Sequence, residues 1–174
     1  SPGDPATPLY PLETRVASFT LEILLAAGPA RDVILRGEGQ SELEDDLRRA
    51  AAAQGRTVTP ESLPENGLFF RADHFSLARR GVPLLLIMGI AGGSDLINGG
   101  RAAGDQWIAD YTGNCYHQTC DAFSSDWDLR GAGQDISLFK TIIEDLGNSR
   151  RWPQWYEGSE FKAVRESSNL LGQQ

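Results

Sequence analysis

Two histidines and two cysteines carry the most specific chemistry in this chain, and three of the four lie together. Cys115, His117 and Cys120 fall within the run Cys115-Tyr116-His117-Gln118-Thr119-Cys120-Asp121. The cysteine spacing does not match a zinc ribbon, which needs two such pairs. The cysteines are either two buried thiols or a local disulfide, and their closeness favours the disulfide, which indicates an oxidising compartment. A disulfide would fix the direction of the His117 imidazole, as a metal ligand requires. The alternative is a surface-loop histidine without a role.

The second histidine lies in the run Arg71-Ala72-Asp73-His74-Phe75, at a predicted turn between a strand and a helix. At the carboxyl end of a sheet strand, such turns often line a site. Asp73 can cap the following helix or support a site from behind, and capping is the favoured interpretation. The chain has no H-E-x-x-H, Gly-x-Ser-x-Gly or P-loop lysine motif, so no common short motif assigns a reaction.

Composition excludes some classes of partner. The net charge is −8 and the basic residues are scattered, whereas a nucleic-acid-binding protein usually has a basic face. The longest apolar run, residues 82–88, is too short to span a bilayer. The first residues show no signal-peptide pattern, which fits either a cytoplasmic protein or a chain whose leader was removed.

The positions of apolar residues predict the elements that hold these side chains. Strands are expected at residues 16–25, 32–36, 68–70 and 83–88. A helix should open at Ser41, with Glu44 completing a capping box, and stop at Gly55. A short helix is expected at residues 74–80 and a long one at 129–146, whereas residues 89–114 read as a long loop. The apolar positions assigned to the long helix are Ile136, Phe139, Ile143 and Leu146.

Strands that alternate with helices predict an α/β sandwich with a mostly parallel sheet. Residues 1–151 are expected to form the main body of a domain. Residues 152–174, which contain Trp152, Trp155 and Phe161, should form a tail that packs on this body or extends from it.

Five motifs, in sequence order, resemble the di-zinc aminopeptidases, a family that includes secreted bacterial leucine aminopeptidases. The run 71–75 followed by Gly81-Val82-Pro83 is similar to the family's R-S-D-H-F…G-V-P, with Ala72 where serine is usual. Tyr116-His117-Gln118…Asp121 resembles its Y-H-Q-x-x-D. The remaining matches are Gly37–Leu43 (Gly-x-Gly-Gln-Ser-Glu-Leu), Trp127-Asp128-Leu129-x-Gly131, and Trp152-Pro153-Gln154-Trp155…Gly158-Ser159-Glu160-Phe161.

The resemblance implies an αβα sandwich that binds two zinc ions through five side chains, with a separate glutamate as the general base. His117 would be one ligand, and Tyr116 would donate a hydrogen bond to the oxyanion. Glu22 stands where the family has an aspartate ligand, and Thr20 where it has asparagine. Arg71 would contact the substrate, while Asp73 and His74 would support the site from behind. The Cys115–Cys120 disulfide also resembles one in secreted relatives.

The family's first histidine ligand, its bridging aspartate and its pair of glutamates lie upstream of the strand that contains Glu22. The resemblance therefore implies the C-terminal half of an extracytoplasmic aminopeptidase domain. Its partners would be peptide N-termini and the missing N-terminal half, and this chain alone would bind zinc weakly and be inactive. Two alternatives are a non-catalytic scaffold, as in the transferrin receptor ectodomain, and an enzyme related to glutaminyl cyclases.

Overall fold

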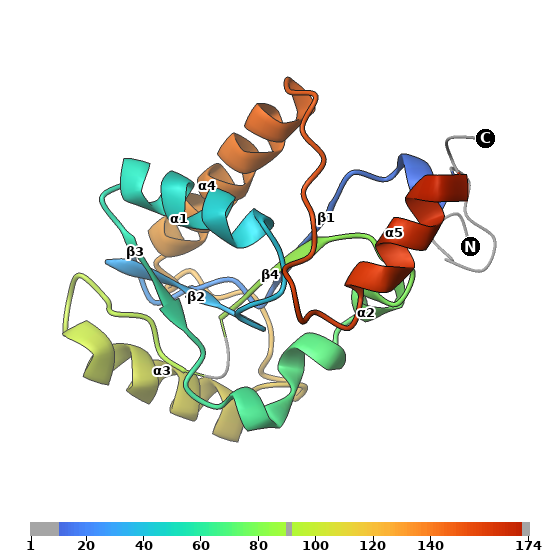
Figure 1. Ribbon diagram of the computed structural model, residues 1–174. Helices are drawn as coiled ribbons and strands as arrows, with labels where there is room; N and C mark the ends of the chain where they lie inside the picture. The colour runs from blue at the N-terminus through green and yellow to red at the C-terminus, as the bar shows by residue number, and fades with distance from the viewer. Residues whose placement is uncertain (1–10, 90–91, 172–174) are drawn as a thin grey trace.

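A four-stranded sheet lies between helices in the computed structural model, which describes residues 11–89 and 92–171 (Figure 1). The strands are β1 (Ser18–Glu22), β2 (Asp32–Leu35), β3 (Thr57–Pro60) and β4 (Leu84–Met88), arranged in the order β1-β4-β2-β3. The α-helices are α1 (Leu43–Ala53), α2 (Phe75–Ala78), α3 (Gly100–Asn114), α4 (Arg130–Gly147) and α5 (Lys162–Leu171). Three short 3-10 helices are η1 (Leu12–Thr14), η2 (Pro64–Asn66) and η3 (Leu68–Phe70). None of the described helices is long and apolar enough to cross a membrane.

The sheet is mostly parallel, as the sequence predicts. β1 pairs with β4 and β2 pairs with β3 in parallel, and the two pairs join where Leu35 lies antiparallel to Ile87. Helices α1 and α4 cover one face, and α3 lies on the other (Figure 1). The predicted α/β sandwich is therefore confirmed.

Strand β4 is buried along its whole length, and its side chains pack against the helices on both faces of the sheet. Leu85 and Ile87 point into the core under α1 and α4. Leu86 and Met88 point to the opposite face, where Tyr111 of α3 packs against them. This alternation explains why residues 83–88 form a continuous apolar run, which the sequence correctly identifies as a buried strand.

Helix α1 forms where the sequence places it, with Leu43, Leu47, Ala50 and Ala51 buried. The carboxylate of Glu44 accepts hydrogen bonds from the main-chain N–H groups of Gly39, Gln40 and Ser41. The Ser41 hydroxyl has no hydrogen-bond partner among the described residues. Only the glutamate half of the predicted capping box is therefore formed.

The prediction of a strand at residues 68–70 is wrong. These residues form η3, because Gly67 has a left-handed φ of 60° that turns the chain into a 3-10 helix. Phe69 is buried there, while Phe70 is exposed. The sequence pattern did not predict β3. This edge strand consists of threonine, valine and proline, and its two end residues are exposed, so it has no run of apolar residues to mark it.

The prediction of a long loop at residues 89–114 is also wrong, since α3 occupies Gly100–Asn114. Residues 90 and 91 lie outside the described residues. Only Gly104 and Ile108 of this helix are buried, so its sequence has almost no helical periodicity. A Cβ at Gly104 would collide with the main chain of Ser94, which explains a glycine at a close helix contact.

Helix α4 lies where expected, and the predicted burial of Phe139 and Leu146 is confirmed, but the centre of its buried face is rotated away from Ile136 and Ile143. Leu138, Phe139, Ile142 and Leu146 pack into the core beside α1, whereas Ile136 and Ile143 are 50% and 47% exposed. Both sets of residues follow a helical repeat, so the pattern alone does not distinguish the two faces.

The corrected face of α4 can be tested by two matched substitutions. Leu138→Ala should lower the free energy of unfolding by about 2–5 kcal/mol, because it opens a cavity in the core. Ile136→Ala removes an exposed side chain and should cost less than about 1 kcal/mol. Urea denaturation of both variants measures the difference, and equal losses would contradict the assignment.

Candidate functional site

Three of the side chains that the sequence singles out line one cleft. Glu22, Arg71 and Tyr116 surround a hollow of about 250 Å³, together with Leu68, Ala72 and Met88. Glu22 is the last residue of β1 and lies beside Met88, the last residue of β4. Because β1 and β4 are parallel, their carboxyl ends open at the same edge of the sheet, where ligands of α/β proteins commonly bind.

Glu22 is half-buried at this edge, and its surroundings disfavour its negative charge. Burial raises the pKa of the Glu22 carboxyl, and the nearby charge of Asp73 raises it further. Asp73 thus interacts with the group that the resemblance names as a ligand position. The cleft combines the carboxyl group of Glu22 with the side chains of Arg71 and Tyr116.

His117 lies next to the cleft through its contact with Tyr116. The two rings stack with their centroids 3.9 Å apart, and Tyr116 packs against Leu86 and Met88. The imidazole of His117 is exposed. The approach of His117 to Glu22, which the resemblance implies, remains a prediction.

The loop that carries His117 is fastened on two sides. Cys115 and Cys120 form a disulfide, as predicted. Asp121 accepts a hydrogen bond of 2.9 Å from the hydroxyl of Tyr111, and its second oxygen lies 3.4 Å from the main-chain N–H of His117. Burial and this contact with Asp121 raise the pKa of Tyr111 to about 12, so Tyr111 remains a hydrogen-bond donor.

The sequence pattern does not single out Tyr111, because Tyr111 lies in α3, a helix with only two buried residues. Asp121 has no sequence signal beyond its place as the last residue of the Y-H-Q-x-x-D match. No local pattern shows that these two side chains meet, since helix α3 brings Tyr111 back to the loop.

Backbone strain is concentrated at the same place. Within the described ranges, the non-glycine residues with a positive φ are Ile23 at 48° and His117 at 59°. One follows Glu22 and the other follows Tyr116. A β-branched residue such as Ile23 rarely adopts this conformation, and residues held in such conformations cluster at functional sites.

Asp73 does not have the role that its local sequence favours, and His74 is buried. The N-terminus of α2 has no side-chain cap, so the capping interpretation of Asp73 is wrong. His74 is 4% exposed, and its Nε2 lies 2.9 Å from the carbonyl oxygen of Phe69, which makes Nε2 the protonated nitrogen. Burial lowers the pKa of His74, an effect that the Phe69 carbonyl and Asp73 partly offset.

The residues at this edge do not make a complete zinc site. Glu22 and His117 have the donor atoms that zinc takes, but the described residues contain no group of three or more His, Cys, Asp or Glu side chains that could hold a metal ion. No reaction step through zinc follows from this set of side chains.

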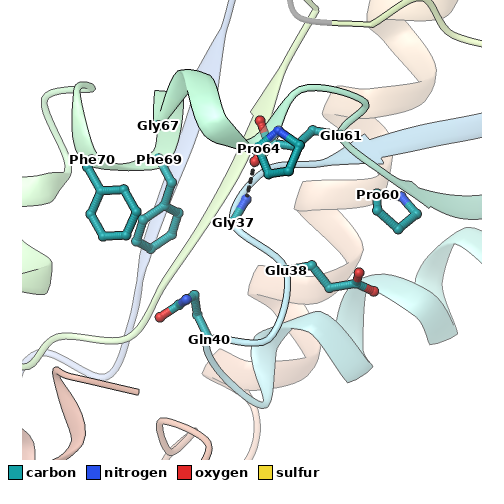
Figure 2. Close-up of a pocket in the computed structure, with 9 residues that line it drawn as sticks. All are labelled: Gly37, Glu38, Gln40, Pro60, Glu61, Pro64, Gly67, Phe69 and Phe70. Carbon is teal, nitrogen blue, oxygen red and sulfur yellow. Dashed lines mark hydrogen bonds between the residues drawn. The ribbon is translucent and has the colours of Figure 1, made fainter. Parts of the chain in front are cut away.

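The glycine-rich run 37–43 borders a different cleft, which holds its own carboxylates (Figure 2). Glu61 accepts a hydrogen bond of 2.9 Å from the N–H of Gly37 and lies 3.8 Å from the guanidinium of Arg36. The carboxylate of Glu44 accepts hydrogen bonds from the N–H groups of Gly39 and Gln40. Gly37, with φ of 65°, leaves no room for a Cβ beside the ring of Phe69. The contacts of residues 37–43 therefore stabilise the conformation of this loop.

The comparison with known proteins gives one match. The model of a family described as Peptidase family M28 matches residues 6–139, which is more than half of the 174 residues. No curated protein and no solved structure matches the chain.

The buried His74 makes a prediction about acid stability. Because its pKa is lowered from 6.5, the folded state loses stability as the pH falls below 6.5, where the unfolded state takes up the proton first. Tm should therefore fall between pH 7 and pH 5, and His74→Gln should reduce that fall.

Thermal unfolding of the wild-type chain and of His74→Gln, followed by circular dichroism, measures the difference. If His74→Gln left the fall in Tm between pH 7 and pH 5 unchanged, the assignment would be wrong.

Proposed function

The chain belongs to peptidase family M28, and from that premise we propose that it supplies part of the site of a zinc-dependent aminopeptidase. Peptidases of this family are usually zinc-dependent hydrolases. The proposal assigns Glu22 and His117 as two metal ligands, Tyr116 as the oxyanion donor and Arg71 as a substrate contact.

The observation that carries the proposal is the cleft at the carboxyl ends of β1 and β4. Glu22, Arg71 and Tyr116 come from separate parts of the chain and line the same hollow. Glu22 and Tyr116 are 94 positions apart in the sequence, so no local contact forces them together. The stacking of His117 on Tyr116 supports the ligand assignment, since it holds the imidazole beside this hollow.

The charges of the cleft suit the amino terminus of a peptide. Glu22 and Asp73 are acidic and would attract the α-ammonium group, whereas the Tyr116 hydroxyl is a donor for an oxygen that becomes negative. Zinc, when bound, would polarise the scissile carbonyl and lower the pKa of a bound water. The disulfide is compatible with an extracytoplasmic location, which we include in the proposal.

This 174-residue chain is proposed to be inactive on its own. We assign two ligands in it and no general base, whereas a catalytic zinc site takes three protein ligands and an open position. Glu22 is also one methylene longer than the aspartate of the family pattern. Further ligands have to come from residues other than those assigned here.

A non-catalytic binding scaffold is the second candidate. Two residues of β1 favour it, because they differ from the family pattern in the strand that carries a proposed ligand. Thr20 stands where the family has asparagine, and Glu22 stands where it has aspartate. A scaffold would keep the cleft as a binding surface without needing the metal.

The inactivity can be tested with aminoacyl p-nitroanilides and purified chain. We expect no hydrolysis above background with or without added zinc, because loss of an acid–base group alone typically costs about 10²–10⁴ in rate. His117→Ala should then change nothing. Zinc-dependent turnover that His117→Ala abolishes would refute the partial-site proposal and establish a complete enzyme.

A further inference from the structure

The chain contains two Asn-Gly steps, and the fold treats them differently. Asn66-Gly67 ends η2, and Asn98-Gly99 forms the turn that leads into α3. Both asparagines are exposed. In such a step the glycine nitrogen can attack the asparagine side chain, because glycine has no Cβ to hinder the approach. Asparagine is accordingly one of the thermolabile residue types, and a difference between the two steps has to come from the structure.

The step at Asn66 is held by hydrogen bonds. The N–H of Gly67 donates to the carbonyl of Pro64 at 3.0 Å, and the N–H of Asn66 donates to the carbonyl of Leu63 at 3.1 Å. Gly67 is also half-buried. Its nitrogen can reach the Asn66 side chain only after the bond to Pro64 breaks, so this step is protected while η2 is folded.

The step at Asn98 lacks this protection. Gly99 is exposed, and neither its N–H nor the side-chain amide of Asn98 makes a hydrogen bond within residues 11–89 and 92–171. The N–H groups of Ile97 and Gly100, on either side, both donate to main-chain carbonyls. The turn is thus fixed at both ends, while the nitrogen and the amide that would react with each other are unbonded.

The structure also requires glycine at this position. Gly99 has a φ of 90°, and a Cβ built on it would lie 2.6 Å from the Cβ of Ala103 in α3. The turn is fastened to the start of β2, because the guanidinium of Arg31 donates to the carbonyl of Ile97 at 3.0 Å. Since β4 lies between β2 and β1, this turn is away from the outer edge of β1.

We propose that Asn98-Gly99 is a site of spontaneous deamidation in the folded chain, and that Asn66-Gly67 is not. The nitrogen of Gly99 bonds to Cγ of Asn98 and passes its proton to the side-chain nitrogen. The Cγ–Nδ2 bond then breaks, ammonia leaves, and a succinimide ring remains. Water opens the ring at either carbonyl, which gives aspartate or isoaspartate and adds one negative charge.

The aspartate product suits its position in the fold. Asn98 directly precedes Gly99, the N-cap of α3, which has no side-chain cap, and the first turn of α3 contains no acidic residue. A carboxylate at position 98 lies near the positive end of the helix dipole and interacts favourably with it. Asn98→Asp should therefore have a Tm equal to or above that of the wild type, so the modified chain remains folded and accumulates.

Peptide mapping of the purified chain tests the proposal. The folded protein is incubated at pH 8 and 37 °C and then digested with trypsin, which separates the steps into peptides 57–71 and 81–101. Mass spectrometry should show Asn98 deamidating at least about 10-fold faster than Asn66, because Asn66 reacts only after local opening. In urea, where neither step is structured, the two rates should become similar.

Asn98→Gln is the matched control, since it keeps the amide but lengthens the side chain so that a five-membered ring cannot form. The wild type should develop an acidic species on ion exchange, and this variant should not. A folded chain in which Asn98 reacts no faster than Asn66 would overturn the proposal. A rate difference that persists unchanged in urea would also overturn it, because the fold would then not be its cause. Neither metal nor substrate enters this test, so its result is independent of the proposed function.

Discussion

The parallel pairing of β1 with β4 is the interaction on which both the core and the candidate site depend. β4 is buried throughout, and its side chains alternate between the layer of α1 and α4 and the layer of α3. Pairing β1 beside it ends both strands at one edge, with Glu22 next to Met88. Residues from the 68–72 segment and Tyr116 then close around that edge, because Leu68, Ala72 and Tyr116 all pack on Leu86 and Met88.

The rest of the site is held from the α3 side of the sheet. Tyr111 of α3 bonds to Asp121, Asp121 approaches the backbone of His117, and the disulfide closes the loop between them. Strain at Ile23 and His117 marks the points where the chain turns away from Glu22 and Tyr116. These contacts fix the backbone of the loop that carries Tyr116 and His117 beside the carboxyl end of β4.

Sequence reasoning predicted the elements whose pattern is strong. β4 and α1 were identified because a buried strand reads as a continuous apolar run and a core helix as a 3.6-residue repeat. It failed where burial leaves little pattern: β3 is an edge strand, and α3 buries only Gly104 and Ile108. On α4, two apolar repeats exist, and only packing against α1 decides which one is buried. The meeting of Glu22, Arg71 and Tyr116 followed from the family resemblance, since no local spacing encodes contacts between such distant residues.

The central proposal is that Glu22 and His117 are ligands in one zinc-binding site. Zinc titration followed by the imidazole nitrogen signals tests it most directly, because the chain has two histidines and His74 is buried against Phe69. We expect zinc to shift the His117 signals with a Kd weaker than about 1 µM, as a two-ligand site should bind less tightly than a complete one. Glu22→Gln should weaken that Kd further, by about 10-fold or more, while the His74 signals stay in place. Zinc that leaves the His117 signals unmoved, or that binds equally well to Glu22→Gln, would contradict the account.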